Sequence, residues 1–283
     1  MLWEDIISND FPAAVEAAKG VCVVPVGCLE KHGPHSPLGT DTIIALEGVR
    51  LAAEKEPVVV FPTMYFGDKT GAGEYAGTVI FSLETRWHIF RETCNEIYRN
   101  GFKKILFVNS HGGNTSMLSA FTRAMMQENP NVMIFNRSVN TSWGACLDSM
   151  ATDRDAFPYL TDEDRTAVQN FRDQKKVMGH ACLGETALVM HYRPELLKMD
   201  KVQSESGDSI HRFDAFKEHG ITTPLGWMAD YPNSYHGSND YVLNARIAKA
   251  FAESQIEALA KAFAFLKNED ISDKYHAQWI EKQ

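Results

Sequence analysis

The sequence predicts an α/β fold, in which a mostly parallel sheet carries helices on its faces. Short runs of β-branched and other apolar residues alternate with longer segments whose apolar residues recur every three or four positions. A polar or glycine-containing loop separates each run from the next helical pattern. No internal repeat, low-complexity segment or linker interrupts residues 1–283, so we expect a single domain.

The first two strand–helix units occupy the N-terminal third of the chain. Val21–Val26 is a β-branched run that predicts a strand, and residues 42–55 show helical spacing of apolar side chains. Residues 58–61 predict the second strand. A helix over residues 83–100 follows, because Ser82 is a favourable N-cap residue.

The third unit has the same order and leads into a fourth strand. Residues 105–108 are an apolar run, residues 109–114 a glycine-rich loop, and residues 115–128 a helical pattern. The helix ends before Pro130, because a residue that precedes proline disfavours the α conformation. Residues 132–135 then predict another strand.

The pattern is less regular in the C-terminal half. Residues 138–176 are rich in polar and small residues and predict an insertion or lid, with one helix that begins at a capping box of Thr161 and Asp164. Residues 184–192 predict an apolar helix. A turn-rich stretch then leads to a long amphipathic helix, whose apolar stripe extends over residues 247–266.

The charge balance excludes several classes of partner. The chain has 28 Lys and Arg against 37 Asp and Glu, a formal net charge of −9. Proteins that follow phosphate backbones or anionic membranes need clustered positive charge, and the sequence shows no such cluster. We therefore expect a neutral or cationic small-molecule substrate, and neither a nucleic acid nor a membrane as partner.

The sequence predicts a reduced, cytoplasmic protein. Its first twenty residues lack the basic and apolar regions of a secretory signal, and charged residues interrupt the apolar C-terminal segment. The cysteines are odd in number, scattered and without CxxC spacing, which argues against disulfides: Cys22, Cys28, Cys94, Cys146 and Cys182.

Residues of the types that bind metals gather in the loops after two predicted strands. The loop after the first strand contains Glu30, His32, His35 and Asp41, and His111 follows the third strand. Ligands of open parallel sheets bind beyond the carboxyl ends of the strands, so we expect these side chains to share one site. Charged groups at strand ends need a partner, which favours a functional role over packing.

A further cluster contains His180, Cys182 and Glu185, and several of the candidates have alternative interpretations. Glu185 is either a ligand or a carboxylate that the N-terminus of a helix favours. His35 either contacts substrate or closes its own turn. Cys28 and Cys182 lack partner spacing, and we interpret them as small buried residues.

This combination of imidazoles and carboxylates predicts a transition-metal site. It suits zinc, manganese or iron, whereas calcium prefers oxygen ligands alone. Two carboxylates and two imidazoles within reach allow a binuclear centre, in which Asp41 is the carboxylate that would bridge two ions.

Residues 71–76 match a dinucleotide-binding fingerprint but lack its context. The fingerprint functions directly after a strand and before the N-terminus of a helix. Residues 64–70 separate these glycines from the preceding strand, and a strand-like run follows over residues 77–81. We therefore expect no nicotinamide cofactor, and interpret the glycines as a loop that passes close to substrate or to another subunit.

Three motifs resemble those of the creatininase family, the creatinine amidohydrolases and their relatives. They are PVGCLEKHGPHSPLGTD, VNSHGGN and HACLGET, in the order and at the spacing of the family. The segment Tyr75-Ala76-Gly77-Thr78 also resembles the family's Phe-Pro-Gly-Thr. The resemblance implies a three-layer α/β/α subunit with a mostly parallel central sheet, assembled as a homohexamer.

The resemblance also implies roles for individual residues. His180 matches a histidine that transfers protons near the substrate. Creatininase carries an additional ligand glutamate in a His-x-Glu form of the second motif, where this chain has His111-Gly112-Gly113. Glu185, in the third motif, is our candidate to replace that carboxylate. The positions that match the family's metal ligands are Glu30, His32, Asp41 (the bridge) and His111.

The expected activity is that of a metal-dependent hydrolase of carbon–nitrogen bonds other than peptide bonds. A metal-bound hydroxide would attack the carbonyl of a cyclic amide, loop N–H groups of Gly112 and Gly113 would stabilise the oxyanion, and His180 or Glu185 would protonate the leaving group. We expect two divalent ions per subunit, zinc first, with manganese or iron as alternatives. Trp143 and Trp227 are expected to pack in the core rather than stack on a substrate ring.

Other specificities remain open, because the His-Gly-Gly-Asn form resembles relatives of several kinds. These are a ring-opening hydrolase of a keto-inositol (3-dehydro-scyllo-inosose type), a formamide hydrolase (deformylase) and a maturation peptidase. A further alternative is a non-catalytic protein in which the same residues hold a structural metal.

Overall fold

Four parallel strands form the centre of the chain. The computed structural model describes residues 1–69, 72–139, 143–175, 178–237 and 242–282. Within them the strand order is β2-β1-β3-β4, so that β1 and β3 are the central strands. The strands are β1 (Val21–Val26), β2 (Val59–Val60), β3 (Lys104–Asn109) and β4 (Met133–Ser138).

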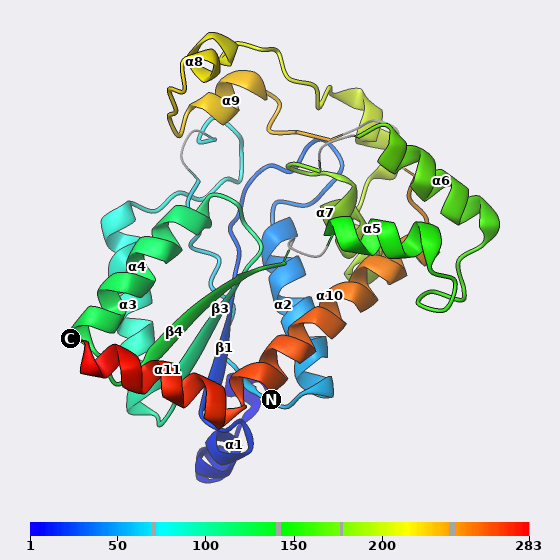
Figure 1. The fold of residues 1–283 in the computed structure, drawn as a ribbon. Helices are drawn as coiled ribbons and strands as arrows, with labels where there is room; N and C mark the ends of the chain where they lie inside the picture. Colours follow the sequence, from blue (N-terminus) through cyan, green and yellow to red (C-terminus); the bar gives the residue numbers. More distant parts are fainter. Residues whose placement is uncertain (70–71, 140–142, 176–177, 238–241, 283) are drawn as a thin grey trace.

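Every residue of β1 and β3 is buried, because helices cover both faces of the sheet. Side chains alternate between the two faces of a strand. Val21 and Val23 therefore belong to one core cluster, with side chains of α2, α7 and α10, while Cys22 and Val24 belong to a second cluster, with α1, α3 and α4. Figure 1 shows α3 and α4 on one side of the strands and α2 and α10 on the other.

The helices extend over most of the remaining chain. The α-helices are α1 (Phe11–Ala17), α2 (Thr40–Lys55), α3 (Leu83–Arg99), α4 (Asn114–Glu128), α5 (Trp143–Thr152), α6 (Asp162–Asp173), α7 (Leu183–Tyr192), α8 (Asp214–Glu218), α9 (Gly226–Asp230), α10 (Ala245–Leu266) and α11 (Glu269–Glu281). Short 3₁₀ turns are η1 (Trp3–Asp5), η2 (Ser8–Asp10), η4 (Pro194–Leu196) and η5 (Met199–Ser204). None of the described helices is long and apolar enough to cross a bilayer.

The predicted fold class is confirmed, and two of the predicted helix caps are present. Ser82 accepts a hydrogen bond from the backbone N–H of Thr85, and Thr161 and Asp164 form the reciprocal capping box of α6. The structure differs in its extent of secondary structure: β2 is shorter than predicted, and the helices α1, α5, α8, α9 and α11 were not predicted. Helix α2 begins at Thr40, which places Asp41 in its first turn.

Within the residues described, the segment 138–176 packs into the core on one face of the sheet. Helices α5 and α6 contact each other, and Trp143, Leu147, Val168 and Phe171 belong to the same core cluster as α10. Trp143 packs against Gly184 of α7, where a Cβ would lie 2.8 Å from the indole ring. The indole is therefore a packing residue in this structure.

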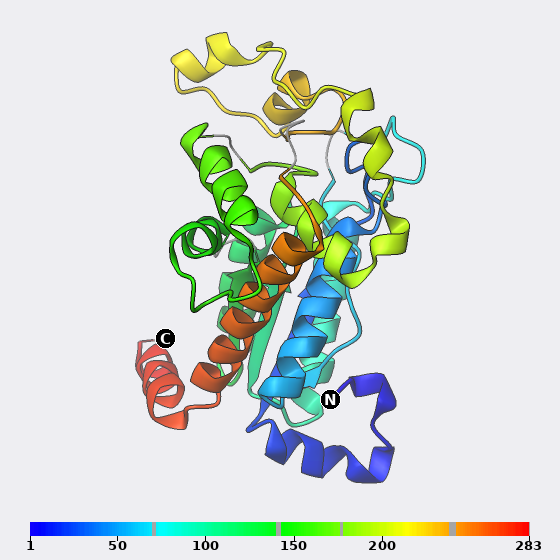
Figure 2. The same cartoon turned by 90° about the vertical axis from the view of Figure 1, so that its right-hand side faces the viewer.

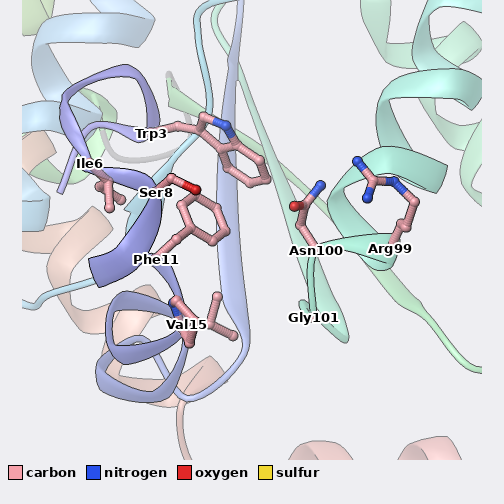
Figure 3. Close-up of a pocket in the computed structure, with 9 residues that line it drawn as sticks. Trp3, Ile6, Ser8, Phe11, Val15, Arg99, Asn100 and Gly101 are labelled. Carbon is pink, nitrogen blue, oxygen red and sulfur yellow. The ribbon is translucent and has the colours of Figure 1, made fainter.

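The two ends of the parallel strands have different surroundings. Figures 1 and 2 show the segment with α8 and α9 beyond one end of the strands, the end that also holds the loops after β1 and β3. At the other end, where the strands begin, Trp3, Phe11 and Val15 line a hollow with Arg99 and Gly101 (Figure 3). The predicted metal ligands all lie at the carboxyl ends of the strands.

Candidate metal centre

Four segments of the chain bring the predicted site residues together. Glu30 and His32 lie in the loop after β1, Asp41 in the first turn of α2, and His111 directly after β3. The loop before α7 and its first turn complete the cluster with His180 and Glu185. Because β1 and β3 are adjacent and parallel, their carboxyl ends deliver the first two segments to one place.

Asp41 lies at the centre of the cluster and faces two groups of side chains. Its Oδ2 is 3.1 Å from Nδ1 of His111 and accepts a hydrogen bond from Sγ of Cys28 at 3.1 Å. Its Oδ1 is 3.5 Å from Nε2 of His32. The two carboxylate oxygens therefore point to different neighbours, as a bridging carboxylate requires.

Three overlapping groups have ligand atoms within 4.8 Å of one another. In the first, Oε1 of Glu30 is 2.9 Å from Nδ1 of His111. In the second, Oε2 of Glu185 is 3.8 Å from Nε2 of His32. In the third, Nδ1 of His180 is 3.7 Å from Oε1 of Glu30. The groups are Cys28–Glu30–Asp41–His111, His32–Asp41–Glu185 and Glu30–His32–His180.

Backbone carbonyls orient the three imidazoles. Nε2 of His111 donates to the carbonyl of Asp68 at 2.6 Å, and Nδ1 of His32 donates to the carbonyl of Glu30 at 3.1 Å. Nε2 of His180 lies 2.7 Å from the carbonyl of Lys31. Each contact directs one ring N–H to a carbonyl, so that in the neutral imidazole the other nitrogen, which faces the carboxylates, keeps its lone pair for a ligand.

Buried polar atoms of the cluster fit a divalent transition metal. Among the described residues, Nε2 of His32 and Oδ1 of Asp41 are buried without a hydrogen-bond partner, and they face each other at 3.5 Å. Such atoms are costly unless they bind something. Imidazole nitrogens combined with carboxylates are the donor set that zinc, manganese and iron prefer.

The electrostatics of the cluster show the same demand for positive charge. Burial raises the pKa of Glu185 to about 8, although His32 opposes this shift. Burial lowers the pKa of His32, but Asp41 and Glu185 outweigh it and raise the value to about 9. Without another cation, protons must balance three buried carboxylates, and a metal ion is the usual alternative.

The structure places the remaining candidates more clearly than the sequence does. The ring of His35 contacts α7: its Nε2 is 2.9 Å from Oγ1 of Thr186, which ties the β1–α2 loop to that helix. Cys28 and Cys182 are buried, as predicted, although Cys28 also donates to Asp41. Trp227 is not a simple core residue, because its ring lies edge-to-face with His180 at 5.2 Å between centroids.

Sequence reasoning missed Lys69, which lies inside the cluster. Its side chain is buried, and Nζ forms an ion pair with Oε2 of Glu30. No sequence pattern marks this lysine, because it follows an irregular segment rather than a predicted strand. The nearby fingerprint at residues 71–76 begins outside the described residues, and residues 72–82 contain turns but no helix.

The parallel sheet and the carboxylate–imidazole cluster at its carboxyl edge define an α/β protein with a candidate metal centre. The chain belongs to the creatininase family: the family's sequence model, described as creatinine amidohydrolase, matches residues 4–263. It is therefore a creatininase-family hydrolase, and the predicted family is confirmed.

Individual relatives and structures agree with this family. Creatinine amidohydrolase of Pseudomonas putida is 22% identical over 223 residues, which cover 76% of this chain and 81% of that protein. A mycofactocin precursor peptide peptidase of Mycobacterium tuberculosis (strain CDC 1551 / Oshkosh) is 34% identical over 113 residues, 36% of this chain and 43% of the peptidase.

Solved structures show the same fold. A creatininase described as the Mn form superposes with a TM-score of 0.69 at 17% identity, covering 94% of this chain and 98% of the other. A mutant creatininase of Zn-Zn type gives a TM-score of 0.71 at 17% identity with the same coverage.

Proposed function

We propose that this creatininase-family hydrolase depends on two divalent metal ions and cleaves a carbon–nitrogen bond of a non-peptide, cyclic amide. The observation that carries the proposal is the geometry of Asp41, whose two oxygens face His111 on one side and His32 on the other. Zinc is the first candidate metal, with manganese or iron as alternatives. The homohexamer and the cytoplasmic location stay predictions.

Two sets of side chains would hold the ions. Glu30, Asp41 and His111 form the first set, and His32, Asp41 and Glu185 the second. Burial raises the pKa of the Cys28 thiol well above its ordinary value, so Cys28 serves as a hydrogen-bond donor to Asp41 rather than as a ligand. Bound metal supplies an acidified water and polarises the substrate carbonyl.

His180 is our candidate for proton transfer. Burial lowers its pKa to about 3, although Glu30 opposes this shift, so the ring is neutral at pH 7. With Nε2–H bound to the carbonyl of Lys31, Nδ1 lies 3.7 Å from Oε1 of Glu30 and would be the atom that holds a proton for the leaving nitrogen. The N–H groups of Gly112 and Gly113, beside His111 at the start of α4, would stabilise the oxyanion.

A second candidate function is hydrolysis of a peptide bond. It is favoured by the similarity to mycofactocin precursor peptide peptidases, one of which matches 74% of this chain at 24% identity. The ring-opening hydrolase of a keto-inositol and the formamide hydrolase share the same metal-stabilised oxyanion. These four substrate classes form the panel that the experiment must compare.

The test combines metal analysis by mass spectrometry with hydrolysis of creatinine, formamides, keto-inositols and short peptides. We expect about two ions per chain and turnover of one class. The variant Glu185→Gln should retain about one ion, and His111→Ala should lose the ion of the first set together with activity. Glu195→Gln, which removes an exposed carboxylate paired with Arg193, is the matched control.

Two results would contradict the proposal. Full metal content and turnover in His111→Ala would remove this residue from the site. One tightly held ion without turnover of any class would favour the non-catalytic alternative, a protein with a closed structural metal site.

A further inference from the structure

Lys69 is a buried lysine that the roles above do not use. Its exposed fraction is 6%, and Nζ pairs with Oε2 of Glu30. The same ammonium lies 5.1 Å from the centre of the Trp227 ring, which packs against His180. The lysine charge is therefore located between a proposed metal ligand and the proposed proton-transfer group.

Contacts of the neighbouring residue hold Lys69 in this position. The backbone N–H of Asp68 donates to Oδ1 of Asn114 at 2.7 Å, and its carbonyl accepts the ring N–H of His111 at 2.6 Å. The carboxylate of Asp68 is 3.1 Å from the guanidinium of Arg86. With backbone and side chain both bound, the segment cannot withdraw the lysine without breaking the hydrogen bond that orients His111.

Gly67 adds a steric reason for the same placement. A Cβ at this residue would lie 2.4 Å from the carbonyl oxygen of Gly27 and 2.6 Å from Cβ of Cys28. Only glycine allows the segment to pass this close to the end of β1. The backbone that carries Lys69 is thus packed directly on the loop that carries Glu30.

The charge of the site explains what the lysine could bind. Glu30, Asp41 and Glu185 supply three carboxylates, and Lys69 is a fourth charged group of opposite sign. Two divalent ions would more than balance the carboxylates, and Glu30 would then be engaged as a ligand. Glu30 would then share its charge between a metal and Lys69, which it contacts through Oε2, so the buried ammonium would be only partly neutralised and would favour a further anionic partner from outside the chain.

We infer that Lys69 recognises a carboxylate of the substrate, beside the amide that is cleaved. The inference rests on the proposed function and narrows its substrate class to amides that carry a carboxylate on the acyl or the amine fragment. Creatinine has no carboxylate and would leave the ammonium without a partner. The charged pair would form a strong, directional contact among buried side chains.

The experiment compares two ligands that differ only in charge, N-acetylglycine and N-acetylglycinamide, by titration calorimetry on the zinc-loaded protein. We expect the wild type to bind the carboxylate at least about tenfold more tightly, the range of one charge-assisted hydrogen bond. Lys69→Met should bring the ratio close to one, and Lys69→Arg should preserve most of it. Should the Met variant fail to fold, Lys69→Gln replaces it.

Controls separate this role from a purely structural one. Lys55→Met removes the same charge from an exposed pair with Glu257 and should leave the ratio unchanged. Metal content is measured on every variant. If Lys69→Met still prefers the carboxylate ligand, the inference is overturned while the proposed function stands. The same holds if Lys69→Met loses its metal, since Lys69 would then serve only to position Glu30. A wild type that binds no metal overturns both.

Discussion

The ring of His111 is held from three directions. Its Nδ1 faces Glu30 and Asp41, its Nε2 donates to the carbonyl of Asp68, and Gly113 lies against the same edge of the ring. A Cβ at Gly113 would lie 2.5 Å from Nε2 of His111 and 2.8 Å from the carbonyl oxygen of Asp68. The second glycine of the motif thus has a steric role in orienting a proposed ligand.

Gly113→Ala should therefore weaken the metal centre. We expect metal affinity or activity to fall about 10–100-fold, the usual effect of losing a contact that orients a ligand. Gly112→Ala is the matched control, because a Cβ there has no neighbour within 4 Å. The measurement is metal affinity by competition with a chelator, and equal affinities for the two variants would contradict the role of Gly113.

Among the residues of the candidate site, those in loops directly after a strand could be predicted from the sequence. Glu30 and His111 could be paired from the sequence because parallel strands bring their carboxyl ends to one edge. Lys69 and Trp227 could not, since their positions depend on tertiary contacts of Asp68 and on the path of the segment around α9. Spacing along the chain carries no signal for such contacts.

Helices α6 and α10 are joined through one carboxylate. Asp164 accepts from the backbone N–H of Thr161 at 2.9 Å, from Nδ2 of Asn244 at 2.7 Å and from Nε of Arg246 at 2.6 Å. Asn244 in turn caps α10 through the N–H groups of Arg246 and Ile247. Asp164 therefore connects the N-terminal caps of two helices far apart in the sequence.

Asp164→Asn should destabilise the fold by about 2 kcal/mol, the range of hydrogen bonds to a charged group. Hydrogen bonds from Arg246 lower the pKa of Asp164 well below its ordinary value, so this carboxylate stabilises the folded state above the unfolded-state pKa of about 4. The stability difference between wild type and variant should be full near pH 7 and shrink as pH falls below about 4.

Denaturant unfolding at several pH values measures this difference. Asp162→Asn is the control on the same first turn, because the side chain of Asp162 forms an exposed pair with Arg154, and its loss should change stability by less than about 0.5 kcal/mol. If the difference in unfolding free energy between wild type and Asp164→Asn stays constant from pH 7 to pH 3, the charge of Asp164 does not contribute to stability.

Element prediction was best where periodicity and caps agreed. The strand Val21–Val26 has the same bounds in the structure, and the capping box of Thr161 and Asp164 forms as predicted. Helix α5 was missed, because its apolar pattern covers too few residues to be recognised in the sequence. Its buried side chains pack against α6 and α10 rather than against the sheet: Trp143, Cys146, Leu147 and Met150. Tertiary packing, rather than the local sequence pattern, stabilises this helix.

For the molecule as a whole, two apolar clusters support a polar edge. One cluster lies on each face of the sheet, and the loops at the carboxyl ends carry fully buried Glu30, His32 and Asp41 between them. Composition and strand–helix alternation predicted this layered architecture because they follow from burial on both faces. The buried polar groups that destabilise the fold are thus gathered at the carboxyl ends of the strands, where bound cations can offset their unfavourable burial.

Metal binding should consequently stabilise the entire fold. An ion that binds only the folded state adds about 4 kcal/mol at a thousandfold excess over Kd, which corresponds to a rise in Tm of about 7 °C for a chain of this size. Scanning calorimetry of the chelated protein, repeated after addition of zinc or manganese, measures the effect. Calcium should give little change, because imidazoles of His32 and His111 are poor ligands for it. His111→Ala should reduce the zinc-dependent rise, because one of the two ions loses a ligand, and an equal rise in that variant would mean that His111 binds no ion.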